Sequence, residues 1–417
     1  MRTGGLRVLR ALAWAGALAG CLLVWWAVTL AAAAVTPVPL LFLWAGTVAA
    51  GAAWLLACDW LAPRRRTAAR LVGVLAVGAS LVGVLVPLGD PQRAPRLPPG
   101  ADSWLLEDGT SLAYGVVRGD DGGRATPVVV LHGGPGVPDT AGLLDVFGSL
   151  AAEGHDVWAY DQRGTGRSTR LADPGGYTTA RAVADLEEVR RRIGAGRVVL
   201  VGHSYGAQLA AAYTAEHPER VERAVFLSPG GLDQQGGGGR PQARLTPVQQ
   251  WQVHRLLVPP RALLAYALVQ VDPAAAHAFA GDVELDARQD RVHAAVRPGL
   301  HCPGHTGPAL HGLGFYATQV PQSWRRPPEP DVRTRLSGTD VPALVVKGQC
   351  DYLDWASATA YLDVFADSRL VYVPGAGHDV HVDAPATVLG AVRAFLAGRP
   401  VPGTLADPRR PPAGYQP

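Results

Sequence analysis

The stretch that decides the fold is Val198-Val199-Leu200-Val201-Gly202-His203-Ser204-Tyr205-Gly206. Its apolar start predicts a buried strand, and the residues from Tyr205 to His217 follow a helical pattern. A Gly-x-Ser-x-Gly turn between a strand and a helix holds its serine in a strained bend, with the hydroxyl exposed above the sheet. The positive end of the following helix lies at the same point. Ser204 is therefore the candidate nucleophile.

Short apolar runs that end in glycine-rich or polar turns recur on both sides of this stretch. The predicted strands are Val128–Leu131, Val157–Tyr160, Val198–Val201, Ala224–Leu227, Ala343–Val346 and Leu370–Val373. The helical patterns between them are Ala141–Ala152, Ala180–Ile193, Tyr205–His217, Ala356–Phe365 and Ala386–Leu396. Alternating units with continuously apolar strands predict an α/β fold with a mostly parallel sheet and helices on both faces.

The chain divides by composition into five regions. We expect a membrane region at 1–90, a proline-rich linker at 91–100, and a core made of 101–229 and 339–398. A hairpin around Asp108-Gly109 should open the core. Residues 230–338 carry helical stretches but few strand-like runs, so we interpret them as an inserted, mainly helical cap. The proline-rich tail, 399–417, is predicted to be disordered.

The N-terminal region contains three apolar runs, Ala11–Val35, Leu40–Cys58 and Leu71–Leu88, and no charged residue lies between Arg10 and Asp59. Runs near 20 apolar residues are long enough to span a bilayer as helices. We therefore predict about three transmembrane helices in a multi-pass cell-membrane protein, with the lipid bilayer as a partner. Two alternatives are a cleaved signal peptide within residues 1–34 and a lipoprotein-like box ending at Cys21.

Arginines set the predicted orientation of these helices. Arg2, Arg7 and Arg10 precede the first run, and Arg64, Arg65, Arg66 and Arg70 lie between the second and third. Positive loops stay in the cytoplasm, so three spans place the residues after 90 outside it. That later part carries 31 basic against 33 acidic residues, a balance of −2, and so it has no basic face for nucleic acid.

The downstream partners of Ser204 should follow the last two predicted strands. Asp351 comes after the first of them, and His378 follows the second in a Gly-Ala-Gly-His turn. A serine needs a base to act as a nucleophile, and the base needs an acid to orient it. The order Ser, Asp, His is typical of such sites. Asp354 and His381 are rival assignments, and His203 is interpreted as a packing residue.

An acyl transfer also requires donors for the developing oxyanion. The backbone N–H of Tyr205 is one candidate, and the second is Gly134 in the His-Gly-Gly-Pro-Gly turn after a predicted strand. Pro135 lacks an N–H and cannot donate. No Cys or His spacing indicates a metal, and we expect the chemistry to need no cofactor. Lys347 is the sole lysine, which we interpret as a trait of composition.

Three motifs together resemble the proline iminopeptidase family of α/β-hydrolases. They are His132–Gly136, Asp161–Ser168 and Gly202–Gly206. The resemblance covers roughly the core and implies the α/β-hydrolase fold, with Ser204, Asp351 and His378 as a catalytic triad and Gly134 with Tyr205 as the oxyanion hole. It also implies a serine aminopeptidase that releases an N-terminal residue, often proline, from small peptides or amides. The membrane region is not part of that family's usual pattern.

Members of that family capture the free amine of the substrate with acidic residues of the cap. The candidates here are Asp282, Glu284, Asp286 and Asp290, of which we favour Glu284 and Asp286. A solvated helix face explains these residues equally well. The same machinery could instead hydrolyse esters or lactones, and a non-enzymatic membrane sensor on this scaffold is a third reading. If the core is extracytoplasmic, Cys302 and Cys350 could form a disulfide; the alternative is two buried thiols.

Overall fold

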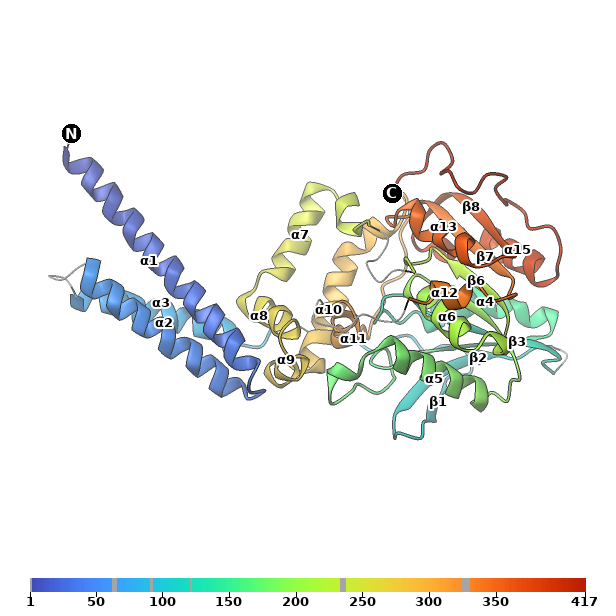
Figure 1. Cartoon of the computed structure of the whole chain (residues 1–417), viewed down its shortest axis with the longest axis horizontal. Helices are drawn as coiled ribbons and strands as arrows, with labels where there is room; N and C mark the ends of the chain where they lie inside the picture. Colours follow the sequence, from blue (N-terminus) through green and yellow to red (C-terminus); the bar gives the residue numbers. More distant parts are fainter. Residues whose placement is uncertain (1, 62–65, 91–92, 121, 233–237, 324–330) are drawn as a thin grey trace.

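The protein is described by a computed structural model that covers residues 2–61, 66–90, 93–120, 122–232, 238–323 and 331–417. Arg64 and Arg65, on which part of the predicted orientation depends, lie outside the described residues. Three regions succeed one another along the long axis of the molecule: an N-terminal bundle of long helices, a helical cap and a sheet-containing core (Figure 1).

An eight-stranded sheet forms the centre of the core, in the order β1-β2-β4-β3-β5-β6-β7-β8. β1 and β2 form the predicted hairpin, β2 runs antiparallel to β4, and the strands from β4 onward are parallel. The strands are β1 Asp102–Leu105, β2 Ser111–Val117, β3 Ala125–Leu131, β4 His155–Tyr160, β5 Val198–His203, β6 Val221–Leu227, β7 Ala343–Cys350 and β8 Ser368–Gly377. The predicted α/β architecture is confirmed.

Helices cover both faces of the sheet because its strands are apolar on both sides. In β3, Val128 and Val130 pack on one face, and Val129 and Leu131 pack on the other. The first face is covered by α4 Thr140–Phe147 and α15 Pro385–Leu396, and the second by α5 Thr179–Arg192, α6 Tyr205–Glu216 and α13 Trp355–Val364. Because alternate side chains of each strand point to opposite faces of the sheet, they contribute to two separate hydrophobic cores.

The cap is inserted between β6 and β7 and contains no named strand among its described residues. Its longer helices are α7 Pro247–Leu257, α8 Pro260–Val269, α9 Pro273–Phe279 and α10 Asp282–Val296, followed by α11 Phe315–Gln319; α12 Arg333–Leu336 leads back to the core. Thr246 caps α7 by a reciprocal capping box with Gln249, so the helix begins where the sequence places a Thr-Pro pair.

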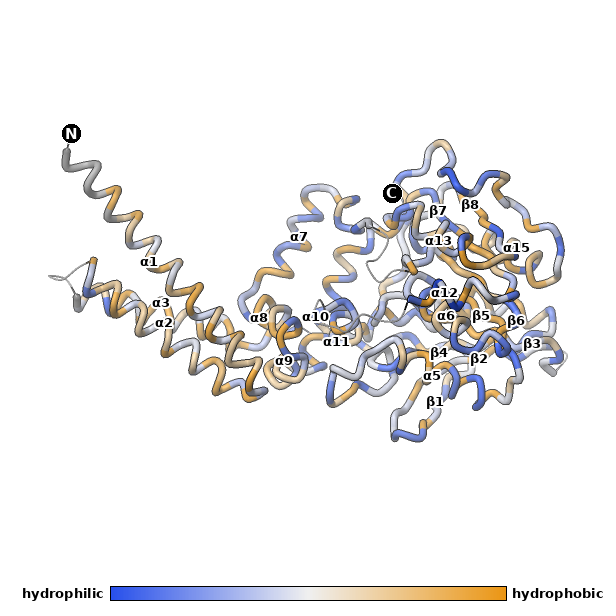
Figure 2. The backbone as a smooth tube through the Cα atoms, viewed as in Figure 1, coloured by the Kyte–Doolittle hydropathy of each residue, from blue (hydrophilic) through white to orange (hydrophobic). Residues whose placement is uncertain are grey.

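Three helices make up the N-terminal bundle: α1 Arg2–Ala33, α2 Pro39–Leu61 and α3 Arg66–Leu85. Within them Ala11–Ala33, Pro39–Leu61 and Thr67–Leu85 are long and apolar enough to cross a membrane. Figure 2 shows that hydrophobic residues predominate along the bundle, whereas hydrophobic and hydrophilic residues alternate along the backbone of the core. The three predicted apolar helices are therefore present in the structure.

The bundle is joined to the cap. Phe42 of α2 meets Phe279 of α9, with ring centroids 6.4 Å apart. A side chain added at Gly83 in α3 would stand 3.5 Å from Pro260, at the start of α8. Figure 1 shows α8 and α9 lying between the bundle and the rest of the molecule. The cap thus separates the helices of the bundle from the sheet.

The C-terminal tail corrects one prediction. The sequence predicts that residues 399–417 are disordered, yet in the structure Thr404 pairs with Val371 in the first half of β8, and the end of the tail reaches the carboxyl end of β7. Trp355 donates from its indole to the carbonyl of Pro408 at 2.9 Å, and the backbone N–H of Gln416 donates to Gln349 O at 2.9 Å. Tyr415 packs its ring against Trp355. The prediction of disorder was based on proline content alone, which gives no information about these aromatic contacts with the core.

Candidate active site

The turn between β5 and α6 places Ser204 in an uncommon backbone conformation. Its φ is +53°, in the left-handed region that is costly for a residue with a side chain. The turn is held by a hydrogen bond from Ser204 N to Leu227 O at 2.9 Å. Gly206 is required two residues later, since a Cβ there would come within 2.2 Å of Leu131 O. The surrounding sheet therefore fixes the bend that presents the hydroxyl.

Two side chains from distant parts of the chain line up behind this hydroxyl. His378, just after β8, places Nε2 2.9 Å from Ser204 Oγ, and its Nδ1 lies 2.7 Å from Asp351 Oδ1. Ser204 and His378 are 7% and 4% exposed, and Asp351 is fully buried. The structure thus brings together the three predicted residues in a continuous hydrogen-bonded chain. Such a chain can remove the hydroxyl proton and stabilise the imidazolium that forms.

The second oxygen of Asp351 has a partner that the sequence analysis missed. Lys347 Nζ lies 2.8 Å from Asp351 Oδ2, and both side chains are fully buried. Burial alone raises the pKa of the Asp351 carboxyl, but the charges of Lys347 and His378 outweigh it and hold this pKa below its ordinary range. A signal was available: a lone lysine in an otherwise apolar strand requires a buried counter-charge.

The rival assignments lie elsewhere. Asp354 caps α13, accepting a hydrogen bond from Ser357 N at 3.0 Å. His381 Nε2 faces Asp139 Oδ2 at 3.3 Å. His203 points its Nε2 at the carbonyl oxygen of His378, 3.1 Å away, and is almost fully buried. It therefore supports the backbone that carries the histidine and does not contact the serine hydroxyl in any hydrogen bond of the described chain.

The glycine-rich turn after β3 passes directly over the nucleophile. A Cβ at Gly133 would lie 3.1 Å from the Cβ of Ser204. The cap holds this turn from above: Thr318 Oγ1 donates to Pro135 O at 3.0 Å, and Gly314 N donates to Gly136 O at 2.9 Å. Gly134, the predicted oxyanion donor, immediately precedes these two anchored residues. The cap and the core therefore both shape the space above Ser204.

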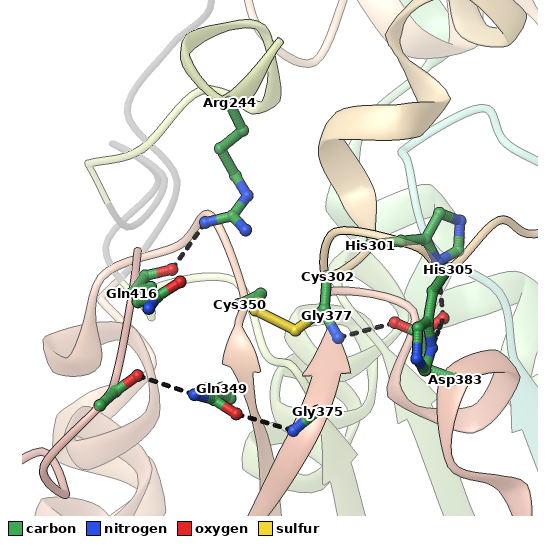
Figure 3. The surroundings of a disulfide bond; sticks show 11 residues. Arg244, His301, Cys302, His305, Gln349, Cys350, Gly375, Gly377, Asp383 and Gln416 are labelled. Atoms are coloured by element: carbon green, nitrogen blue, oxygen red, sulfur yellow. Dashed lines mark hydrogen bonds and ion pairs between the residues drawn. A yellow bond between two sulfur atoms is a disulfide. The ribbon is translucent and has the colours of Figure 1, made fainter. Parts of the chain in front are cut away.

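A disulfide joins the cap to the core beside the site. Cys302 of the cap and Cys350, the last residue of β7, are bonded, which confirms the predicted pairing (Figure 3). Next to it, His301 Nδ1 faces Asp383 Oδ1 at 2.8 Å. Burial lowers the pKa of His301, but the hydrogen bond and charge of Asp383 raise it overall. His378 N donates to Leu300 O in the same cap segment at 2.6 Å.

The acidic residues predicted to bind a substrate amine all have partners within the protein. Glu284 accepts from Arg261 Nε at 2.6 Å and from Leu88 N at 3.0 Å. Asp286 accepts from Arg170 Nε at 3.0 Å and from Phe315 N at 2.7 Å. The same holds for Asp282, which faces His277, and for Asp290, which accepts from Gly312 N and Leu313 N.

These contacts correct the interpretation of Glu284 and Asp286. Glu284 joins the cap to the N-terminal bundle, and Asp286 joins α10 to Arg170 of the core. Burial raises the pKa of the Asp286 carboxyl to about 7, against the opposing effect of Arg170. The sequence could not reveal these roles, because both arginines lie far from the carboxylates along the chain.

An open pocket adjoins the nucleophile turn on the side of α5. Its wall includes Pro135, Tyr160, Tyr177, Tyr205 and Ala317, so it draws on the turn after β3, the core and the cap. Asp185 also lines it, but Arg163 binds this carboxylate through two hydrogen bonds. Among the described residues, no group of three or more His, Cys, Asp or Glu side chains is placed to hold a metal ion.

Comparison with known proteins places this geometry in context. Residues 126–385 match a family model described as alpha/beta hydrolase fold. The proline iminopeptidase of Heyndrickxia coagulans is 39% identical over 111 residues, which are 26% of this chain and 37% of that relative. The chain therefore spans well under half the length of this curated relative.

Two further similarities extend over more of the chain. The 1-acylglycerol-3-phosphate O-acyltransferase ABHD5 of Sus scrofa is 30% identical over 281 residues, which are 62% of this chain and 74% of that relative. The crystal structure of VinJ covers 72% of this chain and 99% of its own, with a TM-score of 0.51 and 22% identity. At that identity, the likeness to VinJ concerns the fold alone.

Proposed function

The chain belongs to the alpha/beta hydrolase fold family, and from that premise we propose that it is a serine hydrolase. The observation that carries the proposal is the hydrogen-bonded chain from Ser204 Oγ through His378 to Asp351. In α/β sheets of this kind, reacting groups gather at the carboxyl ends of the strands. Ser204, Asp351 and His378 follow β5, β7 and β8 at that edge.

In the proposed reaction, His378 accepts the proton of Ser204 as the oxygen attacks the substrate carbonyl carbon. The oxyanion that forms receives hydrogen bonds from the backbone N–H groups of Tyr205 and Gly134. The imidazolium then passes its proton to the leaving amine or alcohol, and the acyl group remains on Ser204. Water, activated by the same imidazole, hydrolyses this acyl-enzyme and restores the hydroxyl.

Two substrate classes each have a supporting observation. Release of an N-terminal residue from small peptides or amides is favoured by the identity with proline iminopeptidases. Small esters or lactones are favoured by Glu284 and Asp286, because carboxylates already bound to arginines are poor ligands for a free amine. We place the aminopeptidase activity first, with ester hydrolysis as the alternative.

We also propose that the enzyme is a multi-pass membrane protein with its catalytic core outside the cytoplasm. Three helices of sufficient length and the arginines near their ends support this topology. The disulfide between Cys302 and Cys350 supports it independently, since disulfides persist in oxidising compartments. Reporter proteins fused after residue 90 test this topology. A reporter that is active only outside the cytoplasm should be active in the fusion, and a reporter that is active only in the cytoplasm should be inactive.

The catalytic proposal is tested with the full chain in detergent and its Ser204→Ala variant. A fluorophosphonate should label the wild-type protein and not the variant. A panel of aminoacyl amides and short-chain esters then separates the two substrate classes. Turnover of esters with none of the amides would refute the aminopeptidase assignment, and no labelling of correctly folded wild-type protein would refute the serine hydrolase itself.

A further inference from the structure

Lys347 is a buried charged side chain with three polar contacts beside the candidate active site. Its ammonium lies 2.8 Å from Asp351 Oδ2, and it donates to Leu353 O at 3.0 Å and to Ser357 Oγ at 3.1 Å. The contact with Asp351 is an ion pair and the other two are hydrogen bonds, so the ammonium has three oxygen partners in all. Lys347 itself is 0% exposed. The group is thus held without help from solvent.

The choice of residue is informative. Every other side chain of the Lys and Arg class in this chain is arginine, yet this position carries a lysine. A guanidinium is a planar fork, whereas an ammonium is a compact point charge with three directions for hydrogen bonds. Of the two groups, only the compact ammonium fits among these three oxygens, which belong to residues that follow β7. A buried cation of this kind is costly unless it is paired, so its partner matters.

We propose that Lys347 is a positioning residue for Asp351, holding Oδ2 so that Oδ1 faces His378 and balancing the carboxylate charge. The inference rests on the proposed function of the triad. Within the described residues, no hydrogen bond or ion pair joins Lys347 to Ser204 or His378, so it acts through Asp351. With the ammonium present, the carboxylate is neutralised before the imidazole takes a proton.

Other charged or titratable groups face Asp351 and His378 from neighbouring elements. They are Tyr352 and Asp354 after β7, His203 at the end of β5, Asp379 and His381 after β8, Arg244 in the cap, and Tyr415 in the tail. Unlike the Arg244 guanidinium, the Lys347 ammonium forms an ion pair with the Asp351 carboxylate. Burial raises the pKa of Asp351, and Lys347 is the largest influence that lowers it.

The first test is Lys347→Met in the full-length protein, with the rate of fluorophosphonate labelling followed from pH 5 to 9. Without the ammonium, an uncompensated buried carboxylate draws the proton onto the neighbouring imidazole. The acid limb of the labelling profile should therefore move to higher pH by about one to two units, the size expected for one charge at an effective dielectric near 20. At pH 6 the labelling rate should fall about 10- to 100-fold.

The matched control is Ser357→Ala, which removes another hydrogen bond of the same ammonium but leaves every charge in place. Its profile should keep the position of the acid limb seen in the wild-type protein. A purely structural lysine would give similar profiles in both variants. A Lys347→Met profile that superimposes on that of the wild type would overturn the proposal.

A second arm decides the matter if Lys347→Met does not fold. Asp351→Asn alone leaves the ammonium unpaired beside the histidine, where it opposes formation of the imidazolium. Adding Lys347→Met removes that charge, so the double variant should label about tenfold faster than Asp351→Asn and unfold at a higher temperature. A double variant no faster and no more stable than the single one would refute the inference. Absence of labelling in the wild type would instead refute the proposed function.

Discussion

A buried ion pair of the cap, Arg261 with Glu284, contacts the end of the N-terminal bundle and the segment after it, and replacing Glu284 by leucine should weaken this joint. Glu284 accepts hydrogen bonds from Arg261 Nε at 2.6 Å, from Arg261 Nη2 at 2.8 Å and from Leu88 N at 3.0 Å. The two charged side chains are 9% and 15% exposed, so the guanidinium would be left largely buried without a counter-charge. Breaking such a pair costs about 3–5 kcal/mol.

The remaining contacts of the arginine sharpen this prediction. Arg261 also donates to Val84 O at 3.0 Å and to Phe279 O at 2.9 Å, and its guanidinium lies 4.5 Å from the centre of the Phe279 ring. These contacts keep it in place when Glu284 is lost. The charge therefore cannot escape to solvent, and the penalty should fall in the upper part of the range.

The assay is thermal unfolding of the full chain in detergent, combined with limited proteolysis at residues 86–100. A loss of 3–5 kcal/mol should lower the midpoint by roughly 6–15 °C for a cooperative unit of this size, and should accelerate cleavage at the joint. The matched control is Glu219→Leu, whose ion pair with Arg220 is mostly exposed and should be worth less than about 0.5 kcal/mol.

The double variant Arg261→Met with Glu284→Leu removes both charges and should recover part of the loss. Two results would refute the reasoning. One is a Glu284→Leu protein that melts within about 2 °C of the wild type, which is less than 1 kcal/mol would produce. The other is a double variant that is no more stable than the single one.

Three further predictions concern the site and its supports. Gly206→Ala should reduce fluorophosphonate labelling at least about 100-fold, because its Cβ would stand 2.2 Å from Leu131 O and displace the nucleophile turn; labelling equal to the wild type would contradict this. Burial, aided by neighbouring histidines, holds the pKa of His203 well below its ordinary value, so the unfolded chain takes up a proton below about pH 6.5 that the folded chain refuses. Stability should be retained above that pH and lost as the pH falls, and His203→Gln should show a shallower loss of melting temperature between pH 6.5 and 5; an unchanged slope would count against it. Cys302→Ser should cost about 3–4 kcal/mol, since the bond closes a loop with a sequence separation of 48, and a reductant should destabilise the wild type but not the variant in denaturant titrations.

Local patterns predicted the parts of the structure that local physics determines. The nucleophile turn at Ser204 requires a strand, a tight turn and a helix in succession. The position of Ser204 in the fold could therefore be deduced from the nine residues Val198–Gly206. Asp351 and His378 were found because the ends of parallel strands meet at one edge. The three side chains form the predicted hydrogen-bonded chain, and the three apolar helices overlap their predicted ranges, although the third begins and ends a few residues earlier than predicted.

The remaining misreadings share a physical cause: each depends on a partner far away in the sequence. Glu284 and Asp286 were interpreted as free acids, but their arginines come from another helix of the cap, α8, and from the core. Lys347 was interpreted as a trait of composition because the sequence of β7 does not reveal which group contacts the lysine ammonium. The tail was predicted to be disordered because of its prolines, but the contact between Tyr415 and Trp355 attaches it to the core.

The cap is fastened on two opposite sides, by a disulfide to the sheet and by Glu284 to the segment that follows the three apolar helices. A lid fixed in this way cannot swing away as one piece while both fastenings hold. Admission of a substrate must therefore come from rearrangement of side chains and loops along the rim. In the proposed membrane topology, any larger motion of the catalytic half would also tilt it relative to the bilayer, so that access to Ser204 and the orientation of the core on the membrane would be linked.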